Sequence, residues 1–214
     1  MLTIRPIAAT PAEAFRLAAD LAPYLARAAR RAPDAVKFLE EEGAEALHAR
    51  AIAEAEAAGE LETLEETMAA LRQAKLSHHI AVAARDLSGQ ADVSAVTADL
   101  THFANTALAA ALKAVLRARD LSPDGLFLFA LGKMGAFELN YSSDIDVAAF
   151  FDPDVFDGGS GEAQMKANRA VQETMRVLEE QTGEGYVFRT DLRLRPESVL
   201  HPACGLHAYG CALL

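Results

Sequence analysis

Residues Leu126–Phe151 read LFLFALGKMGAFELNYSSDIDVAAFF and place two apolar runs on either side of a polar segment. A short apolar run that is bounded by glycine and polar residues is typical of a buried strand. We therefore expect a strand over Leu126–Leu131, an exit turn at Gly132–Gly135, a short helix over Ala136–Leu139 and a second strand over Asp144–Phe151. This pattern predicts a sheet in the second half of the chain.

Two carboxylates, Asp144 and Asp146, open the second predicted strand. Because side chains alternate along a strand, both carboxylates project from the same face. Two like charges at the start of an apolar run are costly unless a cation lies between them. A pair of this kind can hold divalent metal ions for phosphoryl chemistry. An isolated Asp-x-Asp is also common in surface loops, so the neighbouring residues decide between the two interpretations.

A third strand is predicted over Tyr186–Leu194, after a helix that runs from Glu162 to about Thr182. Alternation places four charged side chains on one face of this strand: Arg189, Asp191, Arg193 and Arg195. If the strand neighbours the Asp144 strand, Asp191 completes a cluster of three carboxylates, which can hold two Mg²⁺ ions. The arginines would then bind phosphate oxygens through bidentate hydrogen bonds. The alternative is a salt-bridged strand in which the arginines only neutralise Asp191.

A further candidate is the turn at Gly132 and Lys133, which precedes the carboxylate pair. Glycine in a strand-to-helix turn lets backbone N–H groups approach a phosphate, and a helix N-terminus favours the anion. The pattern differs from a P-loop, because the G-x-x-x-x-G-K-[ST] motif is absent. The sequence shows no Ser-His-Asp or Cys-His arrangement, and Cys204 and Cys211 lack further ligands at zinc spacing. Nucleophilic side-chain catalysis is therefore not expected.

The first half of the chain is alanine-rich and has apolar residues at helical spacing. Expected helices begin at Pro11, Pro33, Ala44, Leu61 and Val93. Within the helix from Leu61, the adjacent His78 and His79 point about 100° apart, which makes them a poor metal pair. We therefore expect ordinary surface or core packing for both histidines. A turn cluster at Leu121–Gly125 marks a boundary, so we predict an α+β chain with a helical region over 1–120 and a small α/β unit over 121–197.

The 214 residues carry a formal net charge of −11, and 51% of them are hydrophobic. A packed core is therefore expected, and an acidic balance argues against binding to nucleic acid or anionic lipid. No apolar run approaches the roughly 20 residues that cross a bilayer, and the N-terminus has no apolar signal-peptide region. The two cysteines are more consistent with a reduced protein than with a disulfide. We expect a soluble, cytoplasmic chain without nucleic-acid or membrane partners.

Three segments together resemble the DNA polymerase β-type nucleotidyltransferase superfamily, and more specifically the glutamine synthetase adenylyltransferase family. They are LGKMG (131–135), ELNYSSDID (138–146) and YVFRTDLRLRP (186–196). The resemblance implies a small nucleotidyltransferase domain with a short mixed sheet. It implies that Asp144, Asp146 and Asp191 are catalytic Mg²⁺ ligands and that Gly132 and Lys133 form the phosphate-binding turn. The remaining nucleotide- or phosphate-binding candidates that it implies are Ser143, Arg193 and Arg195.

Members of that family carry two nucleotidyltransferase domains. The N-terminal one removes AMP from a tyrosine of glutamine synthetase by phosphorolysis, and the C-terminal one adds AMP from ATP. The ELNYSSDID segment and the preceding helices resemble the N-terminal, adenylyl-removing domain. The resemblance therefore implies Mg²⁺, the AMP moiety of ATP or ADP, and inorganic phosphate as ligands. It also implies glutamine synthetase as the protein substrate and a PII-type signalling protein as a regulator of nitrogen metabolism.

Two alternatives stay open at this point. One is a stand-alone nucleotidyltransferase that transfers AMP from ATP, and the other is an inactive, truncated nucleotide-binding fragment. The resemblance covers residues 1 to 197, whereas Ser198–Leu214 contains no Asp, Glu, Lys or Arg. We therefore expect an out-of-family ending over 198–214, produced by truncation or a shifted reading frame.

Overall fold

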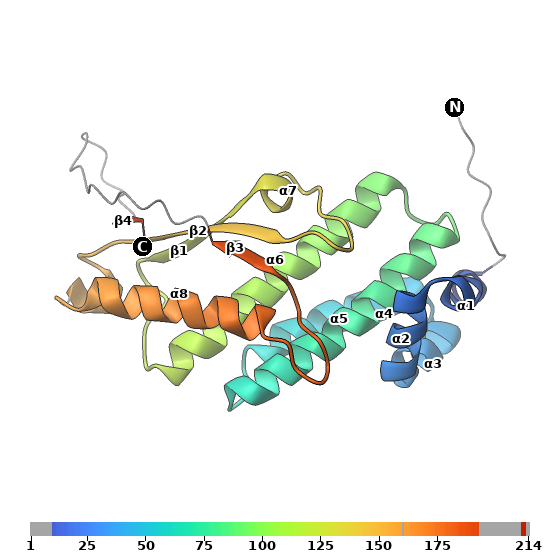
Figure 1. The fold of residues 1–214 in the computed structure, drawn as a ribbon, viewed down its shortest axis with the longest axis horizontal. Coiled ribbons are helices and arrows are strands. Elements are labelled where there is room, and N and C mark those ends of the chain that lie inside the picture. Colours follow the sequence, from blue (N-terminus) through green and yellow to red (C-terminus); the bar gives the residue numbers. More distant parts are fainter. Residues whose placement is uncertain (1–9, 160, 193–210, 213–214) are drawn as a thin grey trace.

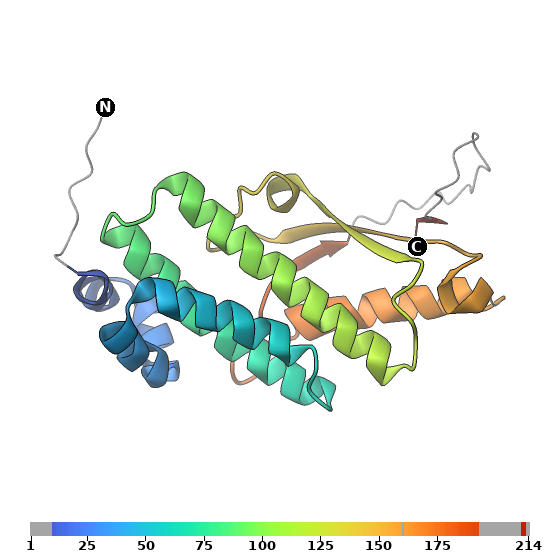
Figure 2. The ribbon, with the colours of Figure 1, turned by 180° about the vertical axis from the view of Figure 1, so that it is seen from behind.

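The structure, a computed structural model, describes residues 10–159, 161–192 and 211–212. Helices make up most of the molecule, and a small sheet lies along one side of them (Figure 1). Helix α6 (Val93–Ala118) packs against α4 (Ala44–Ala58), α5 (Leu64–Leu87) and α8 (Ala163–Glu179). Seen from behind, α6 lies between the α4–α5 pair and the sheet (Figure 2). The α+β class predicted from the sequence is confirmed.

Three short helices at the end of the molecule far from α8 each begin with a proline (Figure 1). They are α1 (Pro11–Leu21), α2 (Pro23–Arg31) and α3 (Pro33–Glu42). Proline suits the first helical position because its missing N–H is not needed there. The predicted single helix ahead of α3 is wrong, because Pro23 forces Ala22 into an extended conformation. Thr10 caps α1 and accepts a hydrogen bond from the backbone N–H of Glu13 at 3.2 Å.

Helix α5 begins at Leu64 rather than at the predicted Leu61. A capping box sets this start. The hydroxyl of Thr63 accepts from the N–H of Glu66 at 3.2 Å, and the Glu66 carboxylate accepts from the N–H of Thr63 at 3.0 Å. These bonds satisfy two of the donors that a helix start leaves open. The predicted starts of α3, α4 and α6 are confirmed.

A mixed sheet forms from β1 (Leu126–Leu131), β2 (Ile145–Phe151), β3 (Thr190–Leu192) and β4 (Cys211–Ala212). Strand β2 is central. It pairs antiparallel with β1 and β4 and parallel with β3. Alternate residues of β2 are buried against the helices, namely Ile145, Val147, Ala149 and Phe151. The opposite face of the sheet carries Asp146 together with the exposed side chains of Phe127 and Phe129.

Three predicted boundaries near the sheet are wrong. The second strand starts at Ile145 instead of Asp144, and the described part of the third strand starts at Thr190 instead of Tyr186. Residues 187 and 188 turn toward α8, because their N–H groups both donate to the carbonyl of Leu178, at 2.8 and 3.1 Å. The short helix is α7 (Gly132–Gly135) and not Ala136–Leu139. The positive φ of 60° at residue 137 ends the helical turn.

One hydrophobic core runs through the sheet and the helices that pack against it. Most of its buried residues come from α4, α5, α6, α8 and the inner face of β1 and β2, and Met134 of α7 joins them. A second, smaller core lies among α1, α2, α3, α4 and one side of α5. The turn cluster at residues 121–125 therefore marks a change in the kind of element, while the larger core spans both sides of it.

Candidate active site

The predicted neighbours Asp146 and Asp191 lie side by side in the sheet. Strands β2 and β3 are parallel, and their register pairs Asp146 with Asp191, while Leu131 of β1 pairs with Asp146 from the other side. Residues that are paired in register point to the same face, and neighbouring strands lie about 4.8 Å apart. The half-buried Asp146 and the exposed Asp191 therefore form one row across the outer face. The expectation that the third strand neighbours the second is confirmed.

Asp144 lies just before β2 and is held by an arginine. Arg189 donates from Nε to Oδ1 of Asp144 at 2.5 Å and from Nη2 to the carbonyl of Ser142 at 3.0 Å. The hydrogen bond to Asp144 raises the pKa of the Arg189 guanidinium. The carbonyl of Arg189 also accepts from the N–H of Ile145 at 3.0 Å. This arginine therefore ties the segment before β3 to the start of β2 through both side chain and backbone.

The turn that follows β1 touches the carboxylate row. Gly132 has a φ of +53°, and a Cβ built on it would lie 2.6 Å from Oδ2 of Asp146. The left-handed backbone favours glycine at this position, and any added Cβ would displace the Asp146 carboxylate. The predicted phosphate-binding turn thus lies directly against Asp146, and the Lys133 side chain next to it is exposed.

The polar loop between α7 and β2 is stabilised by its own hydrogen bonds. The hydroxyl of Ser143 accepts from the N–H of Asn140 at 3.1 Å, and the side-chain carbonyl of Asn140 accepts from the N–H of Ser142 at 3.0 Å. Ser143 therefore shapes the loop that presents Asp144. At the start of this loop, the N–H of Leu139 donates to the hydroxyl of Thr101 on α6 at 3.3 Å. Sequence reasoning missed this anchor, since a threonine inside a helix gives no local sign of its distant partner.

The chemistry of these side chains fits a magnesium ion, because carboxylate oxygens are its usual protein ligands. Because Gly132 has no side chain, the backbone of the turn can come close to Oδ2 of Asp146. Within residues 10–159, 161–192 and 211–212, however, no group of three His, Cys, Asp or Glu side chains is arranged to hold a metal. Asp146 and Asp191 come together, whereas Asp144 is paired with Arg189. Magnesium binding therefore stays a prediction.

Two predicted site residues, Arg193 and Arg195, lie outside the described residues. Two other basic residues, Arg72 and Lys75 of α5, contact the segment that leads into β3 although sequence reasoning assigned them no role. The sequence signal for them was weak: two basic residues, three positions apart, in the middle of a long helix.

His78 and His79 are buried in the helical core, as one of the predicted alternatives had it. The ring of His78 stacks on Phe103 with a centroid distance of 4.6 Å, and burial holds the pKa of His78 well below its ordinary value. The Nδ1 atom of His79 lies 2.5 Å from the hydroxyl of Tyr24, and burial lowers the pKa of His79 to about 3. Its ring also meets the edge of Tyr141 in the polar loop. Both histidines are therefore neutral packing residues.

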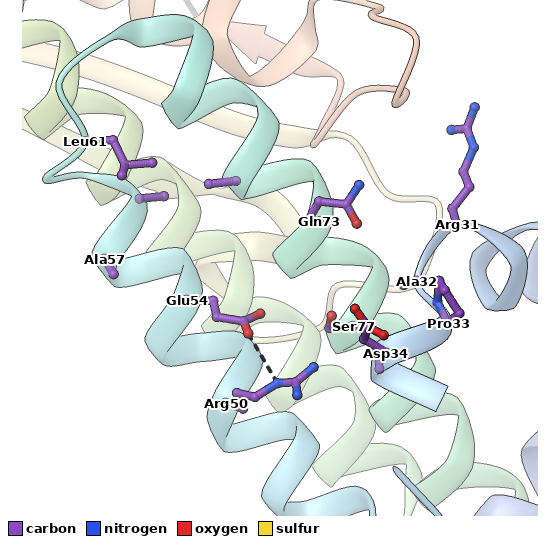
Figure 3. Close-up of a pocket in the computed structure, with 13 residues that line it drawn as sticks. Arg31, Ala32, Pro33, Asp34, Arg50, Glu54, Ala57, Leu61, Gln73 and Ser77 are labelled. Carbon is purple, nitrogen blue, oxygen red and sulfur yellow. Dashed lines mark ion pairs between the residues drawn. The ribbon is translucent and has the colours of Figure 1, made fainter. Parts of the chain in front are cut away.

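A cavity of about 410 Å³ opens in the helical region, among the α2–α3 turn, α4 and α5 (Figure 3). Arg50 and Glu54 form an ion pair of 3.2 Å at its wall, and Gln73 and Ser77 of α5 line the facing side. None of the predicted site residues lines it. The cavity and the carboxylate row are thus separate features.

A family model described as glutamate-ammonia ligase adenylyltransferase matches residues 13–208. A protein of Caulobacter vibrioides is 41% identical over 191 residues, which cover 82% of this chain and 19% of the relative. A protein of Mesorhizobium japonicum is 38% identical over 196 residues, covering 83% of this chain and 20% of the relative. Both relatives are named bifunctional glutamine synthetase adenylyltransferase/adenylyl-removing enzyme. The chain thus spans about a fifth of the length of these relatives.

The family match continues to residue 208. The resemblance seen in the sequence motifs was expected to end at residue 197. In the described part of the chain, no helix is both long and apolar enough to cross a membrane. The cytoplasmic location and the absence of a nucleic-acid partner stay predictions. The match over most of the chain, together with identities near 40%, shows that the chain belongs to the glutamate-ammonia ligase adenylyltransferase family.

Proposed function

We propose that this chain is the adenylyl-removing unit of its family and that it transfers AMP from an adenylylated tyrosine of glutamine synthetase to inorganic phosphate. The pairing of Asp146 with Asp191, with Gly132 against Asp146, is the observation that carries the proposal. The name of these relatives, which contains both glutamine synthetase and an adenylyl-removing activity, supports the substrate.

The reaction balances without an added oxidant or reductant. An oxygen of inorganic phosphate attacks the phosphorus of the tyrosyl adenylate and forms a new P–O bond. The bond between that phosphorus and the tyrosyl oxygen breaks, the phenolate takes up a proton, and ADP leaves. Magnesium ions, when bound, neutralise the phosphate charge and stabilise the attacking and leaving oxygens.

The chain's own residues have distinct parts in this scheme. Asp146 and Asp191 hold the metal from neighbouring strands, and Asp144 joins them once its carboxylate is released from Arg189. The backbone of Gly132 and the Lys133 ammonium bind phosphate oxygens beside Asp146. A positive charge near the phosphates lowers the repulsion between the attacking phosphate and the adenylate. The family resemblance adds Ser143, Arg193 and Arg195 as contacts to AMP or phosphate.

An assay with adenylylated glutamine synthetase, Mg²⁺ and inorganic phosphate tests this function. We expect ADP to be released and unmodified glutamine synthetase to accumulate, with no requirement for ATP. Asp191→Asn and Asp144→Asn should lower turnover at least about a hundredfold, because each removes a metal ligand. Asp20→Asn, an exposed carboxylate change on α1, is the matched control and should leave turnover unchanged.

Other results would contradict the proposal. Incorporation of AMP from ATP into glutamine synthetase, without phosphorolysis, would assign the opposite direction of transfer. Binding of nucleotide without any turnover would favour a nucleotide-binding fragment. Stimulation or inhibition by a PII-type protein is a separate prediction, which the same assay can measure by adding that protein.

A further inference from the structure

We propose that Arg72 and Lys75 of α5 are positioning residues, which hold β3 in register so that Asp191 lies beside Asp146. The metal-binding consequence rests on the proposed function, whereas the structural claim does not. The two side chains join α5 to the segment that leads into β3, so the helical region would help to position the carboxylates of the active site.

Arg72 is 1% exposed and binds the end of α8 and the turn that follows it. Its Nε donates to the carbonyl of Gly185 at 2.7 Å, and its Nη1 donates to Val177 at 3.3 Å. Its Nη2 donates to the carbonyl of Glu180. The last carbonyls of a helix lack partners within the helix, and a cation is favourable near that end. Arg72 therefore caps α8 from a different helix.

Lys75 lies one turn further along α5 and binds the next part of the same segment. Its Nζ donates to the carbonyl of Val187 at 2.5 Å and to that of Tyr186 at 3.3 Å. The ammonium also lies 4.7 Å from the ring centroid of Tyr186 and 5.4 Å from that of Phe188. Burial, with a smaller effect from Arg72, lowers the pKa of Lys75 to about 8. The Lys75 ammonium is therefore largely desolvated where it binds these carbonyls.

The segment that Arg72 and Lys75 bind, residues 177–187, ends shortly before β3 and the carboxylate row. Residues 187 and 188 donate to Leu178, and the carbonyl of Arg189 accepts from Ile145 of β2. The described strand β3 has only three residues, so its own ladder provides few hydrogen bonds to fix its register. A slip of one residue would turn Asp191 to the opposite face of the sheet. The bonds from α5 oppose that slip, because they fix the backbone just before β3.

A simple packing role would not require charged side chains at these positions. Burying an arginine or a lysine costs free energy, and apolar residues of similar size fill space at least as well. Arg72 donates to one carbonyl of its own helix, that of Met68 at 2.8 Å. The other hydrogen-bond partners of both cations are backbone carbonyls of residues 177–187, which an apolar side chain cannot bind. The charges therefore act on the position of this segment.

The experiment compares Lys75→Met with Lys75→Arg, Arg72→Lys and a control in the 214-residue chain. Lys113→Met is the control, because Lys113 is an exposed lysine that pairs with Glu60 on another side of the helical region. One readout is the rate of hydrogen exchange at the Ile145 amide, which donates to the carbonyl of Arg189 just before β3. The other is the affinity for Mn²⁺, used as a spectroscopic substitute for Mg²⁺.

We expect Lys75→Met to exchange the Ile145 amide about tenfold faster, because one charge-assisted hydrogen bond is lost. Its Mn²⁺ affinity should fall about tenfold, as for other residues that orient a metal ligand. Arg72→Lys should act in the same direction, since it keeps the charge but loses the fork of donors. Lys75→Arg should restore both values, and Lys113→Met should match the parent chain.

Each contrary result overturns a stated part. Unchanged Ile145 exchange in both Lys75→Met and Arg72→Lys would refute the positioning of β3, and so would faster exchange throughout β1 and β2. Faster exchange at Ile145 with unchanged Mn²⁺ affinity would refute the link to Asp191. A parent chain that binds no Mn²⁺ would refute the metal site of the proposed function, and Ile145 exchange alone would then decide the role of Arg72 and Lys75.

Discussion

Acid should destabilise this chain through the buried histidines of α5. His78 is fully buried, and neither ring nitrogen has a hydrogen-bond partner in the described part of the chain. Burial keeps its folded-state pKa well below the ordinary value of 6.5, with the neighbouring His79 and His48 as smaller causes. At mildly acidic pH the His78 imidazole is therefore protonated in the unfolded chain and neutral in the folded chain. The free energy of unfolding is largest at pH values above the pKa of the unfolded chain, and it falls as the pH drops below that pKa.

The size of the effect follows from the unfolded pKa alone, as long as the folded histidine stays neutral. Lowering the pH from about 7.5 to about 5 then costs about 2 kcal/mol for one histidine with an unfolded pKa near 6.5. His79, whose folded pKa is about 3, adds a similar amount. Two such residues together remove about 4 kcal/mol, which is a large part of the 5–15 kcal/mol that stabilises a typical domain.

Urea denaturation at the two pH values measures this loss in the parent chain and in His78→Leu. We expect the pH-dependent loss to be about 2 kcal/mol smaller in the variant, because it lacks one of the titrating groups. Gln90→Ala, a change at an exposed residue without a titrating group, serves as the control and should show the same pH-dependent loss as the parent. Equal pH-dependent losses in the parent and in His78→Leu would refute the reasoning.

Three further predictions concern the site and its supporting helix. Gly132→Ala and Gly158→Ala both place alanine at positive φ and should each cost about 1 kcal/mol in urea denaturation. Only Gly132→Ala brings a Cβ within 2.6 Å of Asp146, so only this variant should weaken Mn²⁺ binding, by about tenfold. Equal Mn²⁺ affinity in the two variants would contradict the close approach of Gly132 to Asp146. Asp144→Asn breaks an exposed ion pair and should barely move the urea midpoint while it lowers turnover at least about a hundredfold. A large loss of stability would show a structural role instead. Thr63→Ala removes the capping box of α5 and should cost about 1 kcal/mol in the same denaturation assay, whereas an unchanged midpoint would show that packing alone sets this helix start.

The sequence predicted the helices well where their ends carry local signals. Proline or a capping side chain marks the starts of α1, α3 and α6, and each signal acts within one helical turn. Errors arose where two local signals competed. Apolar spacing continued across Pro23, but the proline ring overrode it. The helix predicted over Ala136–Leu139 was also wrong, because residue 137 has a left-handed backbone conformation that a helix does not accommodate.

The candidate site divides in the same way. Gly132, Asp144 and Asp146 were recognisable because their spacing is local and resembles a known family. Ser143 proved to shape the loop through Asn140, a role that its motif did not reveal. The pairing of Asp144 with Arg189 depends on two residues 45 positions apart, and no local pattern specifies it.

What the sequence by itself determined is the α+β class, the family and the three aspartates that the family resemblance marks. Short-range rules suffice for these, since caps, periodicity and motif spacing act between residues that are close in the chain. Only the tertiary structure decided that Asp191 pairs with Asp146 and that α5 holds the approach to β3. Arg72 and Gly185 lie 113 residues apart, so their hydrogen bond exists only after α5, α8 and the sheet have packed around one core.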